Sequence, residues 1–173
     1  METKTAQPKK ETAQGTIIIS SEQLLKQWQE HRALTRRVIE AFPEDKLYSY
    51  SIGGMRPFAA LAMEMQGMAI PGIQGVISGE WETSPEIFNR PAPNPKKELL
   101  KLWDETTEEI NKLWPQIPPH RFQEIDVAFG QYKAPLYYII FYWIDNEIHH
   151  RGQGYVYLRS LGIEPPAFWD RPY

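Results

Sequence analysis

The sequence predicts an all-α protein, an up-down four-helix bundle with a long irregular connection before the last helix. Four segments carry apolar residues at steps of three and four, the period of an amphipathic helix. Proline or a capping residue marks where these segments begin, and proline or glycine marks where they end. With 173 residues, 42% of them hydrophobic, the chain can form one domain with a substantial core.

The first helix is expected to follow Ser20, because Ser20 and Gln23 have the spacing of a capping box. Its apolar stripe runs to Phe42, and Pro43 ends it. Residues 1–15 are polar and lack periodicity, which predicts a disordered tail ahead of a domain spanning residues 16–173.

The second helix is expected to start at Pro57, and its apolar face is interrupted by a single carboxylate, Glu64. Glu64 either faces inward, or it lies at the edge of the stripe and reaches solvent or pairs with an arginine. Pro71 is expected to kink or break this helix. Asn94 and Pro95 read as a cap and a first helical residue that open the third helix. Residues 115–133 are irregular, with a short strand predicted at 125–129.

The last helix is expected to run from Pro135 to Leu161 and to carry three polar residues, Asn146, Glu147 and His150, on its apolar stripe. Burying these groups without partners would cost a few kcal/mol each. A metal ion, a polar partner on another helix, or water must therefore satisfy them.

Composition excludes several classes of function. The net charge of −3 disfavours a nucleic-acid surface, and the absence of cysteine excludes disulfides, thiolate zinc sites and a cysteine nucleophile. No apolar run is long enough to span a membrane, and the N-terminus lacks the apolar core of a secretory signal. We therefore expect a cytoplasmic protein that binds neither nucleic acid nor membranes.

Two segments resemble a known family. NEIHHRGQGYVYLRSLGIEPP is similar to the signature of the DinB superfamily, which includes the YfiT-like proteins, and GGMRPFAALAMEMQGM resembles the family's second helix. The resemblance implies a four-helix bundle, usually a homodimer. It also implies a divalent metal held by three histidines, one from the second helix and two in an H-x-x-x-H step of the fourth. Some members resemble thiol-dependent transferases.

The chain departs from this pattern at two of the three positions. Glu64 and Asn146 stand where the family has histidines, and His150 is kept. Periodicity places all three on inward faces independently of the resemblance. Either they hold a zinc or nickel ion weakly as a mixed triad, or the metal is lost and Glu64 bonds to His150 with Asn146 completing the network. We favour the second alternative.

The functional prediction is a DinB-like protein with a degenerate metal site and no assigned activity. The alternative is a divalent-metal-dependent transferase or hydrolase of the thiol-dependent type that uses the same residues. A metal-free acid–base enzyme using Glu64 and His150 is a third option. A small molecule or a thiol is the expected ligand. A homodimer is expected through exposed aromatic residues such as Tyr138 and Tyr142.

Overall fold

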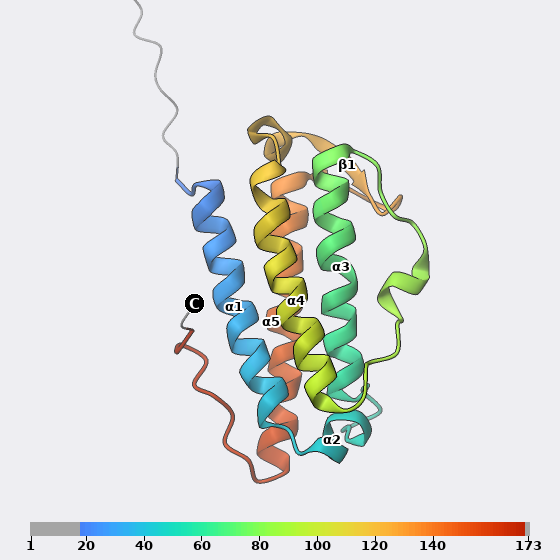
Figure 1. Ribbon diagram of the computed structural model, residues 1–173, viewed down its shortest axis with the longest axis vertical. Helices are drawn as coiled ribbons and strands as arrows, with labels where there is room; N and C mark the ends of the chain where they lie inside the picture. Colours follow the sequence, from blue (N-terminus) through green and yellow to red (C-terminus); the bar gives the residue numbers. More distant parts are fainter. Residues whose placement is uncertain (1–17, 172–173) are drawn as a thin grey trace, which may run out of the picture.

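The computed structural model describes residues 18–171, so the predicted tail at 1–15 lies outside the described residues. Four long helices lie side by side (Figure 1): α1 (Ser21–Ala41), α3 (Phe58–Ser78), α4 (Lys96–Leu113) and α5 (Leu136–Ser160). The short helix α2 (Glu44–Ser49) lies at one end, and an antiparallel hairpin of β1 (Ile125–Ala128) and β2 (Tyr132–Pro135) lies at the other. The mostly helical fold predicted from the sequence is confirmed.

The order of helix directions differs from the up-down prediction. In Figure 1, α3 and α4 run in the same direction, because residues 79–95 pass back along the whole length of the helices before α4 begins. At about 3.3 Å per residue, a connection of this length can span a long helix from end to end. The 3₁₀ turn η1 (Pro85–Phe88) anchors it, and Ile87 of this turn is buried against α3. A long crossover thus replaces the expected alternation.

The helix ends follow local sequence signals with one correction. Ser20 and Gln23 form the predicted capping box, with the Ser20 amide 2.9 Å from Gln23 Oε1 and the Gln23 amide 3.2 Å from Ser20 Oγ. Asn94, however, does not cap α4. The first amide of that helix, on Lys96, instead donates to Glu44 Oε1 of α2 at 2.7 Å. A side chain distant in sequence therefore supplies the cap.

Pro71 lies inside α3 without ending it, so of the expected kink or break, the break does not occur. Proline removes one helical hydrogen bond and costs about 3 kcal/mol. The residues on either side of it, including Ala69, Gly72 and Ile73, are buried in the core. Their packing is therefore what keeps the helix continuous.

The connection before α5 contains more structure than expected. The predicted strand at 125–129 is confirmed as β1, and its partner β2 was missed. Two 3₁₀ turns, η2 (Trp114–Gln116) and η3 (Pro119–Gln123), precede the hairpin. Phe129 and Gly130 have positive φ angles of 52° and 71° and form the turn between the strands. The hairpin places aromatic side chains beside the start of α5.

The core consists of two apolar clusters separated by a buried polar layer. The cluster beside the hairpin contains Trp28 and Trp143, and the cluster beside α2 contains Phe42 and Phe58. The polar layer comprises Arg32, Thr35, Gln66, Glu147 and Arg151, all of them buried. Within residues 18–171, no helix has both the length and the hydropathy needed to cross a membrane.

Candidate functional site

The structure brings Glu64, Asn146 and His150 together between α3 and α5. His150 Nε2 lies 3.0 Å from Glu64 Oε1, and Asn146 Nδ2 donates to the same oxygen at 3.2 Å. Asn146 and His150 are four residues apart on α5, so both side chains point to the same face of the helix. Glu64 reaches them because it lies on the face of α3 that packs against α5.

Two further side chains complete this cluster. The guanidinium of Arg56, which lies just before α3, donates to Glu64 Oε2. Gln153 Oε1 lies 3.1 Å from His150 Nδ1. Neither residue was assigned a role at this site from the sequence, although Arg56 and Gln153 both lie inside the two segments that resemble the family.

These donors stabilise the ionised form of Glu64. The hydrogen bond from His150 lowers the pKa of the Glu64 carboxyl to about 2, with smaller contributions from Arg56 and Asn146, although partial burial opposes the shift. The carboxylate is therefore charged at any pH near neutrality. A group with so low a pKa is a weak proton acceptor.

The cluster does not fit a tightly held divalent metal ion. Glu64 and His150 are hydrogen-bonded to each other, and Arg56 pairs with the second carboxylate oxygen, so a metal ion could bind here only by displacing these contacts. Of the remaining acceptors, Oδ1 of Asn146 is buried without a partner, and a neutral amide oxygen is a poor ligand for zinc or nickel. Within residues 18–171, no three histidine, aspartate or glutamate side chains come close enough to hold a metal.

Of the other histidines, His149 borders this cluster, with its ring centroid 5.0 Å from that of His150, whereas His120 and His31 have other partners. His149 points outward and lies 3.4 Å from Gln153, and His120 is exposed beside Glu124 at 3.6 Å. His31 is buried next to two guanidinium groups, Arg151 at 2.9 Å and Arg171 at 2.8 Å. Burial and these two cations lower the pKa of His31 to about 4.

The buried polar layer accounts for Glu147, the third polar residue on the α5 stripe. Thr35 Oγ1 donates to Glu147 Oε1 at 2.7 Å, and Arg151 donates to Thr35 at 3.1 Å. Arg151 also lies 3.9 Å from the Glu147 carboxylate, which places the two in ion-pair range. Burial raises the pKa of Glu147 and lowers that of Arg32 to about 10. The hydrogen bonds of this layer join α1 to α3, α4 and α5 across the core.

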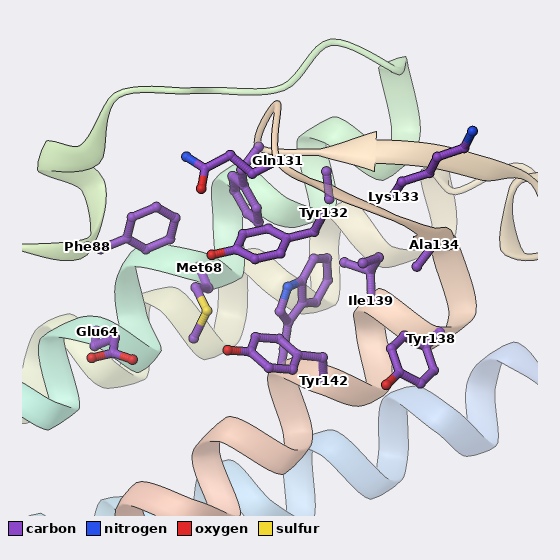
Figure 2. A pocket seen from close by; sticks show the side chains of 13 residues that line it. Glu64, Met68, Phe88, Gln131, Tyr132, Lys133, Ala134, Tyr138, Ile139 and Tyr142 are labelled. Carbon is purple, nitrogen blue, oxygen red and sulfur yellow. The ribbon is translucent and has the colours of Figure 1, made fainter.

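A cavity of about 480 Å³ opens beside Glu64. Its lining comes from four places in the chain: α3, η1, the hairpin and the first turns of α5. Six of the thirteen lining residues are aromatic: Phe88, Phe129, Tyr132, Tyr138, Tyr142 and Trp143. Figure 2 shows Glu64 on one side of the cavity and Lys133 on the opposite side, with the Lys133 side chain directed away.

Sequence reasoning missed this cavity. Periodicity assigned Tyr138 and Tyr142 to an outer face, and both are indeed exposed, at 60% and 50%. It gave no sign that the hairpin and η1 would stand opposite them. The available signal was the concentration of aromatic residues in the connection before α5 and in the first turns of that helix.

The fold and the site define a class of protein: a helical protein with a carboxylate–imidazole pair between two long helices and an aromatic cavity beside it. The family model described as "DinB family" matches residues 1–171, and the chain belongs to this family. A search of curated proteins returned no significant match.

Solved structures share this fold at low sequence identity. A DinB-like protein from Bacillus cereus ATCC 10987 superposes with a TM-score of 0.67 at 19% identity, over 84% of this chain and 95% of that one. The mycothiol-dependent maleylpyruvate isomerase superposes with a TM-score of 0.66 at 14% identity. That match covers 89% of this chain and 65% of the isomerase, so the isomerase is substantially longer.

Proposed function

We propose that this DinB-family protein binds a small organic molecule in the aromatic cavity and that a Glu64–His150 pair stands in place of a tightly bound metal. One observation carries the proposal. The carboxylate that lines the cavity is the same group that Asn146, His150 and Arg56 hold in place. The site therefore presents a fixed, ionised group to whatever enters the cavity.

The low pKa of Glu64 favours binding over acid–base catalysis. General bases work best when their pKa lies near the operating pH. A carboxyl with a pKa of about 2 lies well below that range. Glu64 is better suited to anchoring a ligand than to removing a proton from it.

Metal content tests the first half of the proposal. The protein is purified in buffer containing zinc or nickel, and bound metal is measured by elemental analysis. The matched comparison is the double substitution Glu64→His/Asn146→His, which supplies imidazoles at the two positions where this chain lacks the histidines expected for the family. We expect far less than one metal per chain in the wild type and close to one in the double variant. Stoichiometric, chelator-removable metal in the wild type would contradict the proposal.

A metal- and thiol-dependent transferase or hydrolase is the second candidate. It is favoured by the structural likeness to the mycothiol-dependent isomerase. This candidate requires the stoichiometric metal that the elemental analysis measures. It also predicts that a low-molecular-weight thiol is consumed when an electrophilic substrate is supplied, whereas a binding protein leaves the thiol concentration unchanged.

Homodimerisation is a separate proposal. Tyr138 and Tyr142 are exposed on α5 and also line the cavity. A partner that packs on this face would therefore cover part of the cavity mouth. Light scattering coupled to size exclusion should give twice the chain mass, and Tyr138→Glu should shift the mass toward that of one chain. A wild-type mass equal to one chain would remove this proposal.

A further inference from the structure

We propose that the cavity takes an organic monoammonium ion, a molecule with one positively charged amine and a bulky apolar or aromatic body. This inference rests on the small-molecule binding proposed above and specifies the chemical class of the ligand. It is based on the cavity wall, the hydrogen-bonding capacity left on Glu64, and the placement of charge around the cavity.

The wall favours a flat apolar body. Cavities of roughly 300–1,000 Å³ accommodate organic ligands of drug-like size, and this one has about 480 Å³. The wall has rings on several sides, from the hairpin, η1 and α5. Aromatic faces also attract cations through their quadrupoles. An ammonium group that enters between them is stabilised before it reaches a carboxylate.

Glu64 has room for one more hydrogen bond. An ionised carboxylate offers about four acceptor positions. Oε1 accepts from Asn146 and His150, and Oε2 accepts from Arg56 alone. One position on Oε2 therefore remains, and the side chain is 22% exposed. A ligand donor that reaches Oε2 from the cavity would use this position and leave the existing partners in place.

The charged residues of the cavity discriminate between one amine and two. Among the residues that line it, Glu64 and Lys133 carry charge. They lie on opposite sides of the pocket (Figure 2), and Lys133 is exposed at the rim. A second amine at the far end of a ligand would meet no carboxylate among the lining residues, and Lys133 adds a positive charge at the rim on that side. The arrangement therefore selects a single ammonium group at the Glu64 end.

Three indoles with the same ring system and different ends test this inference: tryptamine, the neutral alcohol tryptophol, and the anionic indolepropionate. Binding to the full chain is measured by titration calorimetry and by ligand-observed NMR at pH 7. We expect tryptamine to bind about tenfold more tightly than tryptophol, because its ammonium group and the Glu64 carboxylate attract each other as opposite charges, whereas the alcohol carries no charge. Indolepropionate should bind most weakly.

Substitutions distinguish the contribution of the Glu64 charge to ligand affinity from that of the aromatic cavity wall. Glu64→Gln should reduce tryptamine affinity to that of tryptophol and leave tryptophol unchanged. Glu108→Gln, an exposed glutamate on α4, should change neither. Tyr138→Ala should weaken all three ligands in equal proportion. The comparison of tryptamine with tryptophol on the wild type decides the ammonium inference even if Glu64→Gln folds poorly.

The contrary outcomes are distinct. Equal binding of tryptamine and tryptophol would overturn the ammonium inference and leave small-molecule binding intact. Tightest binding of indolepropionate, lost in Lys133→Ala, would assign the cavity to anions instead. Failure of all three ligands to bind would remove both the ligand class and the binding function. Stoichiometric metal in the wild type would contradict the metal-independent site whatever the indoles do.

Discussion

Replacing Glu64 by glutamine tests how much the ionised carboxylate contributes to the folded state. Glutamine has nearly the same shape as the protonated acid, but it carries no charge and does not titrate. In the variant, His150, Asn146 and Arg56 lose the charge of their common acceptor, while the apolar packing of α3 is retained. The substitution therefore isolates the electrostatic part of the cluster.

The magnitude follows from the pKa of Glu64, which falls from its usual 4.5 to about 2. Each pKa unit corresponds to about 1.4 kcal/mol, which gives about 3 kcal/mol for the full shift. The side chain is 22% exposed, so solvent screening reduces this to about 2 kcal/mol. For a chain of this size, a loss of about 2 kcal/mol lowers Tm by about 4–8 °C.

The dependence on pH has a defined sign. Because folding lowers the pKa of Glu64, its contribution to the free energy of unfolding is complete above pH 4.5 and is lost as the pH falls toward about 2. The wild type should therefore be more stable than Glu64→Gln at pH 7. The difference should shrink steadily below pH 4.5, since glutamine already lacks the charge.

Urea denaturation of both proteins at pH 7, 4 and 3 measures this difference directly. Glu108→Gln, on the exposed surface of α4, serves as the control and should match the wild type within about 0.5 kcal/mol. A gap between the wild type and Glu64→Gln that stays constant from pH 7 to 3 would refute the reasoning. So would a gap below the error of the control.

Two further predictions concern packing and the buried polar layer. Gly154→Ala should destabilise the protein by about 1–3 kcal/mol, because the new Cβ would lie 2.5 Å from the ring of Phe58. Gly152→Ala on the same helix meets no atom within 4 Å and should stabilise by about 0.5–1 kcal/mol; equal effects of the two in thermal melts would contradict the packing described here. Glu147→Ala should cost about 3–5 kcal/mol in chemical denaturation, because it leaves Arg151 buried without a carboxylate. A loss below about 1 kcal/mol would mean that the polar layer relaxes without it.

The residues of the candidate site could be predicted from the sequence because helical periodicity depends only on neighbouring residues. Glu64 on one helix and Asn146 and His150 on another each interrupted an apolar stripe, and a buried polar group needs a partner. Their contact across α3 and α5 satisfies that requirement. Arg56 was not found, because it precedes its helix and reaches Glu64 from outside the stripe.

In the fold, too, some features follow from local sequence and others depend on tertiary packing. Four helices, their apolar faces and most of their ends follow from spacing, proline and capping residues, all of which act over a few neighbouring residues. The parallel course of α3 and α4 depends on where residues 79–95 pack, which no local pattern encodes. The continuity of α3 through Pro71 likewise depends on burial by distant residues.

The sequence by itself determined the helices and the polar residues that face inward. Both follow from the spacing of apolar and polar residues within a single segment, whatever the rest of the chain does. Only the tertiary structure decided that the hairpin, η1 and the start of α5 enclose a cavity against Glu64. A cavity is the space left between segments far apart in the chain. Its position is therefore set by their packing.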